Sequence, residues 1–137
     1  MNVEMWIDEN GVLMTRLTGV FDADEWMHQR DTIFAGPLAG VDMMARPMVT
    51  DATECFRPDF EWTTHVAKVS LSLNQKSDYT GRRAYIVGGN ANARDALAYF
   101  AELEEKLRDA PNAIRAFRTL NEGYAWATEN WSGPPGD

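Results

Sequence analysis

The fold is decided by Arg82-Arg-Ala-Tyr-Ile-Val-Gly-Gly89, a long amphipathic run, Ala113-Ile-Arg-Ala-Phe-Arg-Thr119 and a second amphipathic run that ends at Asn130-Trp131. Short β-favouring runs alternate here with helical periodicity, which predicts strand, helix, strand, helix. Two strands joined through a helix at this spacing are parallel, with a right-handed crossover, in almost every case. This half of the chain is therefore predicted to be α/β.

The N-terminal segment predicts an antiparallel hairpin. Val3–Ile7 and Val12–Thr18 are short β-favouring runs, and Asp8-Glu-Asn-Gly11 separates them. An Asn-Gly pair between two such runs is a strong hairpin signal. Gly19 is expected to close the second strand.

A helix is predicted over residues 23–35. Asp22 with Glu25 three residues later has the pattern of an N-cap and a capping box. One broad helical face, which we expect to be core, carries Ala23, Trp26, Met27, Ile33 and Phe34.

The rest of the chain completes the prediction of a mixed sheet. Pro47–Thr50 indicates a short buried strand that ends at Asp51, and Asn74–Gly81 an exposed loop. We therefore expect an α/β fold with a mixed sheet of about five strands that is covered by about four helices. The strands are an N-terminal hairpin followed by parallel strands at about 46–51, 82–87 and 113–118. These helices are expected at 23–35, from Pro58 to about Leu73, from a cap at Asn90 or Asn92 to about Leu107, and after the capping box Thr119–Glu122.

Length and charge limit the classes of function. The 137 residues suit one domain, expected over 1–131, with a flexible tail at 132–137. The net charge of -8 repels nucleic acid and anionic membranes in general. Flanking carboxylates dilute the basic side chains of Arg82, Arg83, Arg115 and Arg118. No nucleic-acid partner is predicted.

Cysteine usage and the N-terminus predict a cytoplasmic protein. Cys55 is the only cysteine, so an intramolecular disulfide is excluded, and no Cys and His spacing resembles a zinc site. Glu4, Asp8 and Glu9 stand where a signal peptide would carry lysines, and no apolar run approaches about 18 residues. We predict no export, no membrane insertion, no metal and no cofactor.

Three segments of the sequence resemble a known protein family. Arg83-Ala-Tyr-Ile-Val87, Ala93-Arg-Asp-Ala-Leu-Ala-Tyr-Phe100 and Ile114-Arg-Ala-Phe-Arg-Thr-Leu-Asn-Glu-Gly-Tyr-Ala-Trp126 resemble, in this order, the SpoIIAA-like proteins of the STAS superfamily. That family places Glu-Ala-x-x-Trp in its final helix, whereas Glu122-Gly-Tyr-Ala-Trp126 has a Gly at the usual Ala. The resemblance covers most of the chain as topology and the last fifty residues as motif. It implies a STAS-like fold.

The same resemblance singles out Thr53. STAS-type anti-sigma-factor antagonists carry a phosphorylatable Ser after an Asp at the end of a central strand. This chain has Asp51-Ala-Thr-Glu54, so Thr53 is the only nearby hydroxyl, and Ala52 stands where the first Ser is expected. A phosphate there would be repelled by the carboxylates of Asp51 and Glu54. Two interpretations of Thr53 stay open: it is phosphorylated, or its hydroxyl only caps a helix or a turn.

The carboxyl ends of the parallel strands are the expected ligand edge of an open α/β sheet. Asp51–Cys55, Gly88–Asn92 and Arg118–Asn121 form this edge. Gly88 and Gly89 would let an anion approach a helix N-terminus, with Arg94 one turn further on. Plain turn geometry is the alternative reading of the glycine pair.

The connection from Phe34 to Met44 is unusually apolar. Seven of its eleven residues are Phe, Ala, Leu, Val or Met. It can close over a cavity as a lid, press against a partner, or pack on its own core. The contact candidates are Phe34, Leu38, Val41, Met43 and Met44.

No catalytic constellation stands out. Cys55 and His65 could pair as nucleophile and base, but a lone Cys is usually a small buried hydrophobe. We therefore predict a non-enzymatic cytoplasmic STAS-like module that acts through a protein partner or through self-association as a homodimer. The alternative is a small carrier or sensor of an apolar or anionic ligand, because some relatives of this topology resemble lipid-binding Sec14-type domains.

Overall fold

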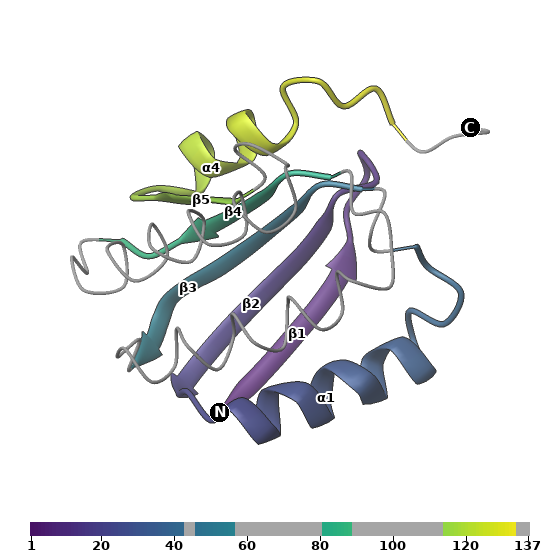
Figure 1. Cartoon of the computed structure of the whole chain (residues 1–137), viewed down its shortest axis with the longest axis vertical. Coiled ribbons are helices and arrows are strands. Elements are labelled where there is room, and N and C mark those ends of the chain that lie inside the picture. The colour runs from purple at the N-terminus through teal and green to yellow at the C-terminus, as the bar shows by residue number, and fades with distance from the viewer. Residues whose placement is uncertain (43–45, 57–80, 89–113, 134–137) are drawn as a thin grey trace, which may run out of the picture.

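The computed structural model describes residues 1–42, 46–56, 81–88 and 114–133 (Figure 1). Five strands form one sheet in the order β1-β2-β3-β4-β5. The first pair is antiparallel and each later pair is parallel, which confirms the predicted mixed sheet. The strands are β1 (Asn2–Ile7), β2 (Leu13–Val20), β3 (Met48–Phe56), β4 (Arg83–Ile86) and β5 (Ile114–Phe117).

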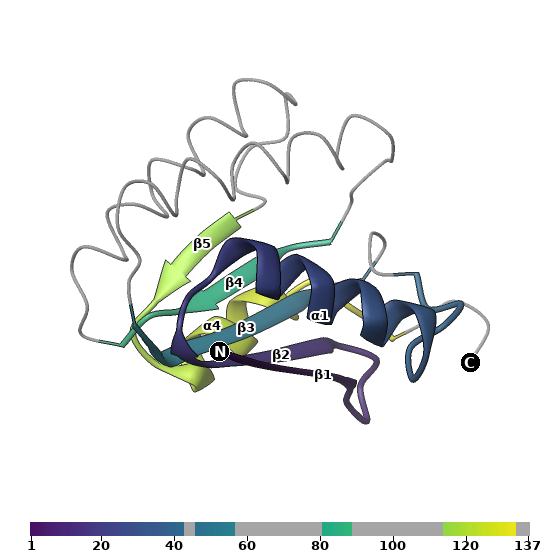
Figure 2. The ribbon, with the colours of Figure 1, turned by 90° about the horizontal axis from the view of Figure 1, so that it is seen from below.

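The two described helices lie on opposite faces of the sheet (Figure 2). Helix α1 (Ala23–Ala35) packs against β1, and α4 (Leu120–Ala127) packs against β3, β4 and β5. Side chains along a strand alternate between the two faces. Val49 and Ile86 therefore point to the α4 face, and Thr50 and Tyr85 to the α1 face. The helices predicted at 58–73 and from Asn90 or Asn92 lie outside the described residues.

Helix α1 begins and ends where the sequence predicted. The Asp22 carboxylate accepts a hydrogen bond of 2.9 Å from the backbone N–H of Glu25. Gln29 then ties the helix to the edge of the sheet, because its Oε1 accepts from the Val3 N–H at 3.0 Å and its Nε2 donates to the Met1 carbonyl at 2.9 Å. The inward helix face, predicted to be core, is only half-buried at Trp26, Met27, Ile33 and Phe34.

Helix α4 begins with the predicted capping pair. The Glu122 N–H donates to Thr119 Oγ1 at 3.3 Å, and that hydroxyl donates to Glu122 Oε1 at 3.0 Å. The helix ends at Ala127. Trp131, which we predicted to be carried by this helix, therefore lies in the segment that follows it.

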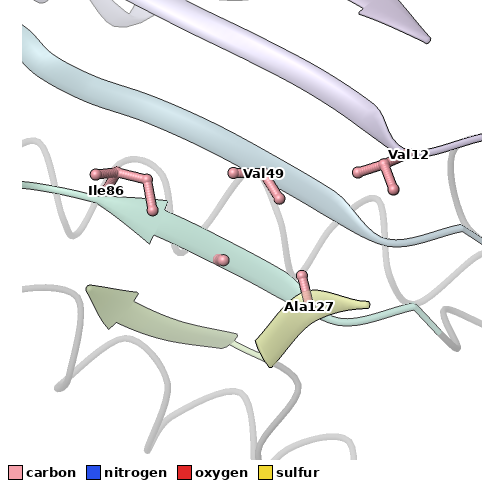
Figure 3. Close-up of a cluster of buried hydrophobic side chains, with 5 residues drawn as sticks. Val12, Val49, Ile86 and Ala127 are labelled. Atoms are coloured by element: carbon pink, nitrogen blue, oxygen red, sulfur yellow. The ribbon is translucent and has the colours of Figure 1, made fainter. Parts of the chain in front are cut away.

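The core beneath α4 leaves no room for a side chain at position 123. Five buried side chains form the cluster in Figure 3, namely Val12, Val49, Ala84, Ile86 and Ala127. A Cβ added to Gly123 would overlap Ile86 Cδ1 and lie 3.4 Å from Ala84 Cβ. A glycine at position 123 thus lets α4 approach the sheet closely.

Two strands run further than the sequence indicated. Strand β2 continues through Gly19 to Val20, and Gly19 adopts a positive φ of 90°. Strand β3 continues past its predicted end at Asp51 to Phe56, because β2 remains its hydrogen-bonded neighbour as far as Val20. Asp51–Cys55 therefore belongs to a strand.

Candidate functional site

The carboxyl edge of the sheet brings together three of the predicted site residues. The Thr53 hydroxyl donates to Asp51 Oδ1 at 2.7 Å, and the Thr53 N–H donates to the same oxygen at 3.1 Å. A Cβ added to Gly88 would lie 3.6 Å from Thr53 Cγ2. Gly88 has a φ of 61°, which favours glycine. Asp51, Thr53 and Gly88 are therefore neighbours, as the rule for parallel strands predicted.

A β-bulge shapes this edge. Arg16 pairs with Asp51 and Thr18 pairs with Glu54, so β3 carries one more residue than β2 in this interval. The Asp51 carboxylate holds the bulge through both of its bonds to Thr53. Thr53 is exposed, and its modification stays a prediction. Arg16 and Glu54 form an ion pair at 3.2 Å beside it.

The apolar connection packs partly on its own core. The N–H of Leu38 donates to the Ile33 carbonyl at 2.9 Å, and the N–H of Val41 donates to the Leu38 carbonyl at 3.1 Å. Leu38 is buried, whereas Phe34 and Val41 are half-buried. A lid or a contact surface at this place stays a prediction. The remaining candidates Met43, Met44, Gly89 and Arg94 lie outside the described residues.

Cys55 is half-buried at the end of β3. Burial raises the pKa of its thiol, and the positive N-terminus partly opposes this. Because the thiolate is the reactive form, this environment disfavours a nucleophilic role. His65, the base considered with it, lies outside the described residues.

We expect Cys55 of the native chain to react with Ellman's reagent at pH 8 more slowly than free cysteine does. Its raised pKa keeps the thiol protonated and its half-buried position restricts access. The same reaction in denaturant serves as the control and should proceed at the rate of free cysteine. A native rate above that of free cysteine would contradict the assignment.

An open groove of about 510 Å³ lies at the opposite edge of the sheet, where the parallel strands begin. No pattern in the sequence indicates this groove. The turn between β1 and β2, the end of α4 and the segment after α4 meet there. The groove, called the amino-end groove below, is lined by Glu9, Asn10, Tyr124, Thr128, Trp131, Ser132 and Gly133.

A hydrogen-bond network holds the walls of the amino-end groove together. The Tyr124 hydroxyl donates to Asp8 Oδ2 at 2.5 Å and accepts from Asn10 Nδ2 at 2.8 Å. Trp131 Nε1 donates to the Asn10 carbonyl at 2.8 Å. The other oxygen of Asp8 accepts from the N–H groups of Asn10 and Val12 at 2.9 and 2.8 Å. One carboxylate therefore organises the turn and anchors Tyr124 to it.

Desolvation by burial raises the pKa of Tyr124, and its hydrogen bond to Asp8 raises it further. The phenol stays protonated as the donor of this network. The pKa of Tyr124 in the folded chain exceeds the unfolded value of about 10. The stabilisation that the protonated phenol gives the folded chain is therefore complete below pH 10. It is lost as the pH rises from there through the folded pKa.

A Tyr124→Phe variant is expected to unfold about 1 kcal/mol more easily at neutral pH, because it loses a hydrogen bond to a carboxylate. Its stability should also fall less than that of the parent chain as the pH rises above about 10. Urea unfolding followed by circular dichroism at neutral and alkaline pH measures both differences. Equal stabilities of the variant and the parent chain at neutral pH would show that the hydrogen bond of Tyr124 to Asp8 does not stabilise the fold.

Trp6 extends the aromatic surface beside the amino-end groove. It is 42% exposed and pairs across the hairpin with Met14. Cross-strand partners share a face of the sheet, and Met14 packs against the same core cluster as Tyr124 and Trp131. Trp6 therefore lies on the α4 face, at the end of β1 that leads into the groove.

The arginines considered as a basic patch are divided between the two faces. Arg83 is buried at 7% exposure and points to the α1 face. Arg82 and Arg115 lie 5.0 and 5.3 Å from the centre of the Trp126 ring. Arg82 also forms an ion pair with Glu129 at 3.3 Å. These residues therefore do not make one continuous basic surface.

Within the described parts of the chain, no group of three or more His, Cys, Asp or Glu side chains is placed to hold a metal ion. The described helices include none with the length and apolar character needed to span a membrane.

Comparison with solved structures supports the fold. The chain is similar to an uncharacterized protein of the DUF3478 family with a SpoIIAA-like fold from Shewanella loihica PV-4. The TM-score is 0.56 at 12% sequence identity, and the match covers 92% of each chain. No family model matches the chain, and no curated protein matches it. The fold is therefore SpoIIAA-like, as the resemblance implied.

Proposed function

We propose that this protein is a non-enzymatic module that binds a protein, either a different chain or a second copy of itself, through the amino-end groove and Trp6. The observation that carries this proposal is the gathering of Trp6, Tyr124 and Trp131 on one face at one end of the sheet. Trp and Tyr are enriched at the centres of protein interfaces, where they contribute most of the binding energy.

The rigidity of the amino-end groove also favours binding. Tyr124 and Trp131 are already held by hydrogen bonds to Asp8 and to the Asn10 carbonyl. A side chain that is ordered before binding loses less conformational entropy when the partner arrives. The network therefore presents aromatic surface in one fixed arrangement.

The chemistry of the groove favours a protein segment over a small apolar ligand. Small-molecule sites enclose most of the ligand in an apolar cavity. The amino-end groove is open and mixes aromatic rings with the polar side chains of Glu9, Asn10 and Thr128. Because Glu9 lines the groove and the chain has a net charge of -8, a partner surface with positive charge complements it best.

Affinity capture with the immobilised full chain tests the proposal. Wild type and a Val20→Ser variant should retain the same protein from an extract of the source cells, and a Trp6→Ser variant should retain much less. Val20 is the matched control because it is 60% exposed at the other end of the sheet. Light scattering over a range of concentrations detects self-association. A monomer at all concentrations, with no protein whose retention depends on Trp6, would contradict the proposal.

A further inference from the structure

The wall of the amino-end groove carries a carboxylate that has no partner in the described part of the chain. Glu9 lines the groove and is exposed, and it forms no hydrogen bond or ion pair with another described residue. The neighbouring Asp8 carboxylate, in contrast, accepts hydrogen bonds from Tyr124 and from the turn. None of the lining residues is basic. Arg46 approaches the turn, but its Nη1 donates to the Gly11 carbonyl at 2.9 Å. The groove is therefore negatively charged.

Two aromatic rings line the groove together with this carboxylate. Tyr124 and Trp131 are half-buried, and their polar atoms are already bound, the hydroxyl to Asp8 and Nε1 to the Asn10 carbonyl. The rings therefore meet an occupant through their carbon atoms and π faces. Burial raises the pKa of Tyr124 most, and the charges of Asp8 and Glu9 raise it further. The Glu9 carboxylate is thus close enough to the phenol to act on it.

A guanidinium group matches this arrangement better than the other groups that a protein partner presents. It is planar and always charged, so it can stack on an aromatic face and pair with a carboxylate at the same time. An ammonium group is a compact, strongly hydrated charge that lacks this planar geometry. An uncharged side chain would remove water from Glu9 without replacing it by a partner, which costs free energy. Asn10 donates its amide N–H to Tyr124 and keeps its side-chain oxygen as a further acceptor.

We propose that the amino-end groove binds an arginine side chain of a different protein, with the guanidinium group against the rings of Tyr124 and Trp131 and paired with Glu9. This inference rests on the proposed protein binding and adds the chemistry of the residue that enters the groove. The volume of about 510 Å³ is in the range of sites that hold a whole small ligand, so residues that flank the arginine enter with it. A second copy of the chain is a poorer occupant, because two chains of net charge -8 repel each other in general.

NMR titration of the full chain with the peptide acetyl-Gly-Arg-Gly-amide, at constant ionic strength, tests the proposal. The indole N–H resonance of Trp131 and the backbone resonances of Glu9 and Asn10 should shift and saturate. The corresponding lysine peptide should bind more weakly, and the glutamine peptide should leave these resonances unchanged. Absence of a saturable shift with the arginine peptide would overturn the proposal. Binding of the lysine or glutamine peptide as tight as that of the arginine peptide would overturn it too.

Two charge variants locate the contact in the same titration. Glu9→Gln keeps the shape of the side chain but removes the ion pair, so it should bind the arginine peptide about fivefold more weakly. Asp24→Asn makes the same change of charge at an exposed position of α1, on the opposite face of the sheet, and should leave the affinity unchanged (Figure 2). Equal weakening in both variants would identify a long-range charge effect and overturn the proposal.

Capture of the protein partner separates failure of this inference from failure of the proposed function. If retention of the partner depends on Trp6 but not on Glu9, and the arginine peptide does not bind, protein binding stands and the assignment to arginine falls. If the resonances of the groove shift when the chain is concentrated without peptide, a second copy occupies the groove and only the inference is overturned. If no retained protein depends on Trp6 and the chain stays monomeric, the proposed function falls and the inference with it.

Discussion

An Ile86→Ala variant is expected to unfold about 3 kcal/mol more easily than the parent chain. Ile86 is 1% exposed and belongs to the cluster beneath α4. Removing its outer carbons leaves a cavity between the sheet and the helix, and the closely packed glycine at position 123 offers no side chain to fill it. Urea unfolding followed by circular dichroism measures the loss.

The matched control for this core variant is Val20→Ala. Val20 is also an aliphatic strand residue but is 60% exposed, so its truncation should change the stability by less than about 0.5 kcal/mol. The dependence of the unfolding free energy on urea should have the same slope in all three chains. A loss below about 1 kcal/mol at Ile86 would mean that α4 does not seal this side of the sheet.

A Trp6→Ser variant is expected to bind the protein partner about thirtyfold more weakly. Truncation of a tryptophan at the centre of an interface costs about 2 kcal/mol or more, and each 1.4 kcal/mol is a tenfold change in affinity. Because the side chain is 42% exposed, the stability of the free chain should change little. Surface plasmon resonance with the captured partner, or sedimentation equilibrium for a homodimer, measures the affinity.

The Val20→Ser chain is the comparison for this binding measurement, and its affinity should equal that of the wild type. If Trp6→Ser also binds as tightly as the wild type, the interface lies elsewhere. If Val20→Ser weakens binding instead, the contact is at the carboxyl edge of the sheet, near Thr53 and Gly88.

Local sequence signals located each helix and strand that the structure describes, although not every boundary. Asp22 and Thr119 are N-caps that satisfy backbone groups within three residues, so their effect is visible in the chain itself. The spacing of strands and helices likewise implied the parallel pairs. The resemblance to SpoIIAA-like proteins added the overall topology.

The amino-end groove could not be predicted, because its network joins residues far apart in the sequence. Asp8 and Tyr124 are 116 positions apart, and Asn10 and Trp131 are 121 apart. The sequence places Asp8 in the connection of the hairpin and Tyr124 in the final amphipathic run. Both placements are correct, but neither reveals that the two side chains meet.

Tertiary context also overrode the sequence pattern in β3 and β4. Polar residues after Thr50 suggested that β3 ended at Asp51, yet its pairing with β2 carries it to Phe56 through a bulge. Arg83 was grouped with surface arginines, yet all four residues of β4 are buried. A strand buried on both faces lacks the alternation that reveals which side chain points inward.

Hydrogen exchange of the backbone, with and without the captured partner, tests whether the amino-end groove and Trp6 form the binding surface. For a homodimer, dilute and concentrated samples replace the two states. We expect slower exchange on binding in residues 6–14 and 124–133, which form the amino-end groove and carry Trp6. Protection confined to residues 51–55 and 86–88, with no change around the groove, would contradict it.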